Sequence, residues 1–235
     1  MFYTIKFKFE YLILPVTVFL IFMTIRLFGD SESLLVASLK ESNTLVIDPG
    51  HGGIDGGALS VAGDKESEIN LAIALKLRSV AELFGEKTVM TRENDKARTD
   101  ALSYSEHEDL VYRTEMINSS PNAVVISIHQ NCYPTSQPSG AQVLFASDDK
   151  SEIFGRTAHE NIIRLLEPEN RRVAEPASPG LYITSNAKCP AILVECGFMS
   201  NLSDIQKLKD NNYQTMLAAV LFASYVQFRY GALRY

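Results

Sequence analysis

After residue 43, short apolar runs alternate with longer stretches in which apolar positions recur every three or four residues. The short runs have the pattern of buried strands, and the longer stretches have that of amphipathic helices. The predicted strands are Thr44–Ile47, Thr88–Met90, Ala123–Ile128, Ala141–Ala146 and Ala191–Val194, and the predicted helices are Glu68–Phe84, Glu106–Ile117, Ser151–Leu166 and Tyr213–Tyr230. This alternation predicts an α/β fold, a single domain with a mainly parallel sheet flanked by helices on both faces.

The N-terminal residues have a different pattern. Between residues 11 and 28 the only charge is Arg26. If the Arg26 guanidinium snorkels, the run reaches the roughly 17–25 residues that a transmembrane helix requires. Lys6 and Lys8 precede the run and acidic residues follow it. The positive-inside rule therefore predicts a cytoplasmic N-terminus and an extracytoplasmic domain.

Two other interpretations of this run stay open, a cleaved signal peptide and a buried core helix. The nearest small-residue cleavage site is Val36-Ala37-Ser38, which lies late for a signal peptide. We therefore expect a cytoplasmic stub and membrane anchor in residues 1–30, a polar linker in residues 31–43 and the α/β domain in residues 44–235.

Composition and charge exclude several classes of protein. Hydrophobic residues make up 46% of the chain, so it is expected to fold. The net charge is -6 and no basic cluster stands out, which argues against a nucleic-acid partner. Cys132, Cys189 and Cys196 have no C-x-x-C spacing for structural zinc. Cys189 and Cys196 flank a predicted strand and would lie too far apart for a disulfide.

Three predicted strands end in residues that can bind a metal or transfer a proton. His51 lies in a glycine-rich turn after the first strand, His129 follows a run of apolar and small residues, and Glu195 ends a wholly apolar run. The carboxyl ends of parallel strands meet at one edge of a sheet, where α/β proteins bind ligands. Two imidazoles with one ligand carboxylate and one catalytic carboxylate suit a mononuclear zinc hydrolase.

Each of these residues also has a simpler interpretation. His129 alone could be a structural histidine, and Glu195 alone could be an exposed loop residue. The glycine-rich turn lacks the spacing and the lysine of a phosphate-binding loop. A serine or cysteine nucleophile has no local motif to support it. The remaining histidines, His107 and His159, lie in polar helical stretches, and we expect both to be solvated.

Four ordered motifs carry a resemblance to a known family. They are DPGHGGIDGG at 48–57, ESEINLAIAL at 66–75, SIHQN at 127–131 and VECGFMSN at 194–201. From Thr44 to the C-terminus the chain resembles the zinc-dependent N-acetylmuramoyl-L-alanine amidases of bacteria, the amidase 3 family. The resemblance implies a six-stranded α/β fold and Zn2+ held by three metal ligands, with one catalytic glutamate. On this sequence the ligands are His51, Glu66 and His129, and the catalytic residue is Glu195.

One departure from the family pattern is Gln130, where a small residue usually precedes the asparagine. We expect it to alter the substrate groove and to leave the metal ligands unchanged. The stretches YSEHEDLVYR, INSSPNAVVISIH and PSGAQV further resemble the germination-specific, spore-cortex branch of the family.

The resemblance implies hydrolysis of the amide bond between N-acetylmuramic acid and L-alanine of the peptidoglycan stem peptide. Glu195 would act as base and then as acid. Alternatives are a zinc peptidase that cuts within the stem and a catalytically inactive wall-binding module. We expect a membrane-anchored enzyme in the cell envelope or the forespore intermembrane space. The chain between Asn131 and Ser151 is short for an inhibitory helix, so we expect control by a separate activating protein.

Helical phase distinguishes Glu66 from its neighbour Glu68. At 100° per residue, Glu66 shares a helix face with Ile73, Leu77 and Phe84, and this face should lie against the sheet. Glu68 points away from that face and is expected to be solvated. Burying Glu66 would be costly unless a cation compensated its charge, which favours Glu66 as the ligand.

Overall fold

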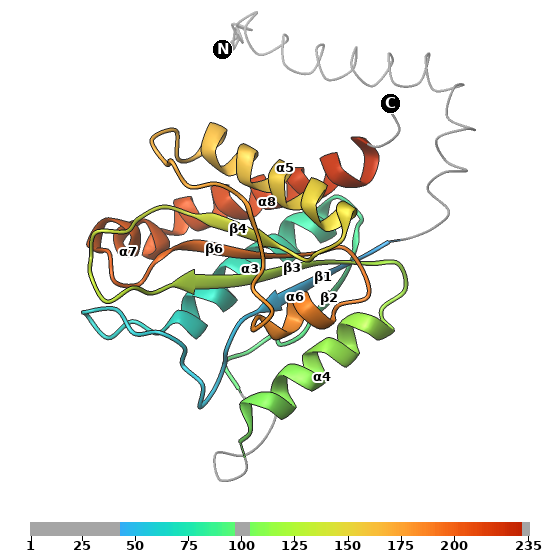
Figure 1. Cartoon of the computed structure of the whole chain (residues 1–235), viewed down its shortest axis with the longest axis horizontal. Helices are drawn as coiled ribbons and strands as arrows, with labels where there is room; N and C mark the ends of the chain where they lie inside the picture. The colour runs from blue at the N-terminus through green and yellow to red at the C-terminus, as the bar shows by residue number, and fades with distance from the viewer. Residues whose placement is uncertain (1–42, 97–103, 232–235) are drawn as a thin grey trace, which may run out of the picture. The chain divides into compact units, whose positions relative to one another are not determined.

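The computed structural model describes residues 43–96 and 104–231, which form a six-stranded sheet with helices on both faces (Figure 1). The strand order is β2-β1-β3-β6-β4-β5, and within the described residues every pair is parallel except β4 with β6. The strands are β1 (Thr44–Pro49), β2 (Lys87–Met90), β3 (Ala123–Asn131), β4 (Gln142–Phe145), β5 (Glu175–Pro176) and β6 (Ala191–Phe198). The predicted α/β fold with a mainly parallel sheet is confirmed.

The helices divide between the two faces of the sheet. They are α3 (Glu66–Leu83), α4 (Glu106–Ser119), α5 (Asp149–Leu165), α6 (Tyr182–Asn186), α7 (Leu202–Lys209) and α8 (Asn211–Gly231). Helices α3, α5 and α8 pack on one face, whereas the shorter α4 and α6 pack on the other (Figure 1). Along β1, Leu45 and Ile47 face the larger layer and Val46 faces the smaller one. Burial on both faces explains why the central strands read as continuous apolar runs.

The element boundaries differ from the prediction in two ways. Strands β3 and β6 continue beyond Ile128 and Val194, so His129 and Glu195 lie inside strands. Strand β5, with two residues, and helix α6, with five, were not predicted, because such short elements show no periodicity. Helix α7 was also missed, although Asn201 caps it with hydrogen bonds from two main-chain N–H groups.

Two side chains lie where the sequence did not place them. Phe84 follows the last residue of α3, is 69% exposed and stacks on Phe222 with ring centroids 5.3 Å apart, so it does not face the sheet. His159 is 4% exposed and its Nε2 lies 2.8 Å from the carbonyl oxygen of Arg172, so the prediction of a solvated histidine is wrong. The segment after α5 folds back over this face of the helix. His107, by contrast, is exposed as predicted.

The predicted membrane anchor and nearly all of the predicted linker lie outside the described residues. None of the helices in the described ranges is long and apolar enough to cross a membrane. The three cysteines are free thiols, so Cys189 and Cys196 are not bonded to each other, as their predicted separation requires.

Candidate metal centre

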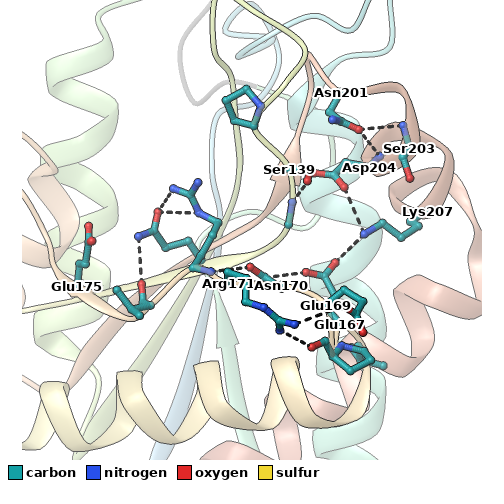
Figure 2. Close-up of a pocket in the computed structure, with 17 residues that line it drawn as sticks. Ser139, Glu167, Glu169, Asn170, Arg171, Glu175, Asn201, Ser203, Asp204 and Lys207 are labelled. Atoms are coloured by element: carbon teal, nitrogen blue, oxygen red, sulfur yellow. Dashed lines mark hydrogen bonds and ion pairs between the residues drawn. The ribbon is translucent and has the colours of Figure 1, made fainter.

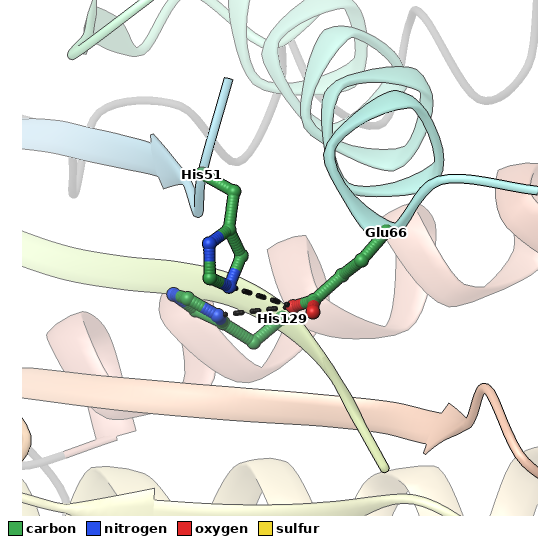
Figure 3. Close-up of side chains that lie close together, drawn as sticks. All are labelled: His51, Glu66 and His129. Carbon is green, nitrogen blue, oxygen red and sulfur yellow. Dashed lines mark hydrogen bonds and ion pairs between the residues drawn. The ribbon is translucent and has the colours of Figure 1, made fainter. Parts of the chain in front are cut away.

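Three side chains from three elements converge at the carboxyl edge of the parallel strands (Figure 3). His51 comes from the turn after β1, Glu66 is the first residue of α3, and His129 lies in β3. One ligand atom from each residue lies within 4.8 Å of the others. The Glu66 Oε1 atom lies 3.3 Å from Nε2 of His51 and 3.2 Å from Nδ1 of His129. Two imidazole nitrogens and one carboxylate oxygen that face one another form a donor set suited to a metal such as zinc.

Two glycines leave room for these three side chains. A Cβ atom at Gly50 would lie 2.1 Å from Cε1 of His129, which is inside the imidazole ring. A Cβ atom at Gly57 would lie 2.7 Å from Oε2 of Glu66 and 2.8 Å from Cδ2 of His51. Gly57 also has φ +67°, a conformation that favours glycine. The glycine-rich motif therefore makes the space in which the ligand side chains meet.

Glu66 is 3% exposed and accepts several hydrogen bonds beside those of the histidines. The main-chain N–H groups of Ala58 and Gln130 each donate to it at 3.0 Å, and Asn70 Nδ2 donates at 3.3 Å. Burial alone would raise the pKa of Glu66, but hydrogen bonds from His129 and His51 hold it well below its usual range. Glu66 is therefore ionised and fixed in place, as a ligand must be.

Asp55 orients the His51 ring from outside the cluster. Its Oδ2 atom lies 2.8 Å from Nδ1 of His51 and accepts a hydrogen bond from the Tyr104 hydroxyl at 3.3 Å. Burial would lower the pKa of His51, but hydrogen bonds to Asp55 and Glu66 raise it to about 10. A metal ligand must give up that proton, and the bond to Asp55 then leaves Nε2 free to face the cluster.

Two buried arginines hold the turn that carries His51. Arg92 donates to the carbonyl oxygens of Pro49 and Gly50, both at 2.9 Å. Arg113 donates to the carbonyl oxygen of Pro49 at 2.7 Å and to that of His51 at 2.6 Å. His51 has a positive φ of 60°, which is uncommon for a residue other than glycine. The two guanidinium groups satisfy the carbonyl groups of the turn and fix the backbone from which the ligand extends.

Asp48 balances the charge of this arrangement. It is 1% exposed and accepts hydrogen bonds from Thr91 at 2.6 Å, Ser127 at 2.7 Å and Arg113 at 3.0 Å. Burial alone would raise the pKa of Asp48, but the Arg113 charge and the two hydroxyl groups hold it below its usual range. Asp48 thus stabilises the arginine that holds the turn.

Glu195 lies beside the cluster and is not a member of it. It pairs with His129 across β6 and β3, and both residues line a cavity of about 300 Å³ together with His51 and Glu66. Its Oε2 atom is buried and has no hydrogen-bond partner among the described residues. Burial raises the pKa of Glu195 to about 7, and the negative charge of Glu66 adds to the rise. This carboxyl group can exchange a proton near neutral pH.

The structure therefore brings together all four residues that the sequence selected, and it leaves Glu68 exposed, as helical phase predicted. It also shows supporting residues that sequence reasoning missed. Asp55 is four positions after His51, a spacing that could have suggested the contact. Arg92 and Arg113 gave no local signal, because they come from other elements.

Gln130 was expected to alter the substrate groove, but its side chain also contacts residues behind the cluster. Its side chain is buried, and Nε2 donates to Oδ1 of Asn70 at 3.0 Å. Asn70 in turn donates to Glu66 and to the carbonyl oxygen of Gly50. The departure from the family pattern thus becomes part of the hydrogen-bond network behind the Glu66 carboxylate.

Comparisons with known proteins agree with this geometry. Residues 45–224 match the amidase 3 family, described as N-acetylmuramoyl-L-alanine amidase. A germination-specific N-acetylmuramoyl-L-alanine amidase of Bacillus subtilis is 32% identical over 232 residues, which is 93% of this chain and 90% of that protein. The CwlD amidase of Clostridioides difficile, solved in complex with the GerS lipoprotein, is 32% identical with a TM-score of 0.74, covering 79% of this chain and 97% of that one. An N-acetylmuramoyl-L-alanine amidase of Clostridium difficile 630 is 27% identical with a TM-score of 0.70, covering 80% and 97%.

Proposed function

The chain belongs to the amidase 3 family of N-acetylmuramoyl-L-alanine amidases, and on this premise we propose that His51, Glu66 and His129 hold a zinc ion while Glu195 transfers the protons. The enzyme hydrolyses the amide bond between N-acetylmuramic acid and L-alanine in peptidoglycan. The ligand set supports zinc, since two imidazoles and one carboxylate leave a coordination position open for catalysis.

Zinc in this position supplies a Lewis acid that polarises the scissile carbonyl group and makes water more acidic. The Glu195 carboxylate removes a proton from the attacking water. The same carboxyl group then gives a proton to the nitrogen of L-alanine, because an amide does not expel an unprotonated amide anion. The hydrogen bonds of Glu66 and Asp55 keep the ligand side chains in place during these transfers.

One observation carries this assignment. Glu195 is half-buried beside the cluster, its buried Oε2 atom has no hydrogen-bond partner among the described residues, and its pKa is raised to about 7. General acid–base catalysis is most effective when the pKa of the group is near the working pH. Glu66 is held ionised by its neighbours and cannot exchange protons in this way.

Metal content and reaction products test the proposal together. The purified full-length protein should contain about one zinc ion per chain by elemental analysis. Chelation should abolish activity and added zinc should restore it. Mass spectrometry of digested muropeptides should show cleavage between muramic acid and L-alanine. Cleavage within the stem would indicate a peptidase, and a fully active metal-free protein would contradict the zinc site.

We also propose a role in the spore cortex. The similarity to a germination-specific amidase over 93% of this chain supports it. Because the substrate is part of the cell wall, the domain acts outside the cytoplasm, and residues 1–30 are proposed to anchor it. Deletion of the gene should change the muropeptides of spores and leave those of vegetative walls unchanged. Protease added to intact cells should degrade the domain if it lies outside the membrane.

An activating protein fits the same comparison. The CwlD amidase was solved in complex with a lipoprotein. We propose that this chain also has a partner that raises its activity. Copurification from sporulating cells, followed by activity assays with and without the partner, tests this; full activity of the isolated chain would contradict it.

A further inference from the structure

A second cavity, of about 900 Å³ (Figure 2), is lined by Gln142, the strand partner of Glu195, and by none of the metal-centre residues. The start of β4, the segment after α5 and helix α7 line it. Several of its charged side chains are already paired. Lys207 lies 2.8 Å from Glu167 and 3.2 Å from Asp204, and Arg171 pairs with Glu169 (Figure 2). The Lys207–Glu167 pair joins α7 to the segment after α5.

Arg172 lines the same cavity and is held differently. Its Nε and Nη2 atoms both donate to Oε1 of Gln142, the first at 3.1 Å. The guanidinium group also lies over the Phe198 ring, 5.0 Å from the ring centroid. No carboxylate pairs with it, and Nη1 has no hydrogen-bond partner among the described residues. The arginine is therefore fixed in orientation and keeps donors available for an anion.

Strand pairing places Arg172 next to the catalytic site. His129, Glu195 and Gln142 are register partners across β3, β6 and β4, so the three form a row across the sheet. Side chains paired in this way lie on one face with Cβ atoms about 4.5–5.5 Å apart. Gln142 therefore stands beside Glu195, and Arg172 is held on Gln142. The row runs from a proposed metal ligand through the proton donor to the arginine.

The proposed proton transfer indicates the direction in which the stem peptide extends from Glu195. Glu195 gives its proton to the L-alanine nitrogen, so that nitrogen must lie against Glu195. Consecutive Cα atoms of a peptide lie about 3.8 Å apart, so the second residue of the stem extends about one strand spacing beyond L-alanine. In the direction away from the metal centre, this distance reaches Gln142, to which Arg172 donates its hydrogen bonds.

We propose that Arg172 binds a carboxylate on the second residue of the stem peptide, and that the cavity beyond it receives the rest of the stem. This inference rests on the proposed function and names the substrate group that the site recognises. An arginine with its planar group held by a glutamine and an aromatic ring recognises a carboxylate through charge-assisted hydrogen bonds. An uncharged amide at the same position would lose the charge and one acceptor oxygen.

A matched pair of substrates tests the proposal without any mutation. The substrates are disaccharide-tetrapeptide muropeptides whose second stem residue is either D-isoglutamate, with a free carboxylate, or D-isoglutamine, with an amide. The full-length enzyme should cleave the carboxylate form with a kcat/KM about 10–100-fold higher, mainly through a lower KM, because hydrogen bonds to charged groups are worth about 1.5–3 kcal/mol.

The variant Arg172→Gln should remove this preference. Its kcat/KM should fall about 10–100-fold on the carboxylate substrate and much less on the amide substrate, which has one acceptor oxygen and no charge. Arg172→Lys keeps the charge without the planar group and should retain part of the preference. Arg156→Gln is the matched control, because Arg156 also lies over an aromatic ring and donates to an oxygen but is absent from the cavity wall. It should leave the preference intact.

The outcomes separate this inference from the proposed function. Equal cleavage of both muropeptides by the unmodified enzyme would overturn the role of Arg172 and still uphold the amidase chemistry. An equal fall on both substrates in Arg172→Gln would mean that the residue acts only on the structure. Cleavage of neither substrate by the zinc-loaded enzyme would contradict the proposed chemistry itself.

Discussion

Two carboxylates in one site, Glu66 and Glu195, have opposite surroundings. Glu66 accepts hydrogen bonds from two main-chain N–H groups, an asparagine and the histidine rings, and its pKa is held well below the usual range. Glu195 is also mostly buried, yet its Oε2 atom has no hydrogen-bond partner among the described residues, and its pKa is raised to about 7. Burial acts in the same direction on both, so the partners decide the difference.

The positions of Glu66 and Glu195 in the fold explain why hydrogen-bond donors reach the Glu66 carboxylate and not Oε2 of Glu195. Glu66 is the first residue of α3, where the helix dipole favours a negative charge, and it accepts from N–H groups of the loop at Ala58 and of β3 at Gln130. Glu195 lies inside β6, where the neighbouring N–H groups are used by the sheet. Donors from separate segments thus meet at the start of α3 and hold Glu66 ionised, whereas no described group reaches Oε2 of Glu195.

The largest expected effect comes from removing Glu66, the carboxylate whose charge is stabilised by hydrogen bonds. Glu66→Ala should lose both bound zinc and activity, because the site keeps only two ligands. The loss in zinc affinity should exceed the ~10–100-fold that follows from loss of an outer-shell partner. Chelator competition and muropeptide digestion measure the two effects. Glu68→Ala, two residues along on the exposed face, should retain both; the opposite pattern would reverse the assignment.

Glu195→Gln tests the other half of the comparison. The kcat should fall by about 10²–10⁴-fold, which is the typical contribution of general acid–base catalysis. Bound zinc should remain at about one ion per chain, since Glu195 lies outside the cluster. Elemental analysis of the purified variant gives the answer. A variant without zinc would show that Glu195 is a ligand and that the two carboxylates have been given the wrong roles.

Arg113→Gln should lower both the stability of the fold and the zinc affinity, although Arg113 is not one of the proposed ligands. It leaves Asp48 buried with only its hydroxyl partners, and the loss of one member of a buried pair costs about 3–5 kcal/mol of unfolding free energy. Zinc affinity should fall about 10–100-fold, because the His51 turn loses two hydrogen bonds to its backbone carbonyl groups.

Denaturant unfolding and chelator competition measure the two consequences of Arg113→Gln. Arg78→Gln serves as the control, because Arg78 forms a more exposed ion pair with Glu93 and should change the unfolding free energy by less than about 1 kcal/mol. An Arg113→Gln protein with unchanged zinc affinity would show that the His51 turn keeps its shape without the hydrogen bonds from Arg113.

The smallest effect is expected for Asn70→Ala. Asn70 donates to Glu66 and Gly50 and accepts from Gln130, so its removal leaves buried groups without partners. The unfolding free energy should fall by about 1–3 kcal/mol, and zinc affinity by about 10-fold. Asn118→Ala, which removes two hydrogen bonds near the surface, should cost less. An equal cost in the two variants would mean that the network behind Glu66 adds nothing to its fixed position.

Much of the fold could be predicted because hydrophobic periodicity is a local property. The buried strands and the long amphipathic helices each carry their own pattern. The choice of Glu66 over Glu68 was local as well, since two residues on one helix differ by a fixed angle. Strand order, the antiparallel pairing of β4 with β6, and the short β5 and α6 leave no such pattern and had to come from the structure.

For the site, the motifs alone selected the four residues to which we assign the chemistry. His51, Glu66, His129 and Glu195 each lie within a recognisable motif. Only the tertiary structure decided their states, because a pKa depends on burial and on partners distant in the chain. Arg113, Asp48 and Arg172 act across gaps of tens of residues, and His159 is buried by a segment that follows it. A local motif gives the type of each residue. The burial of that residue and the partners of its charge arise only when distant segments pack together.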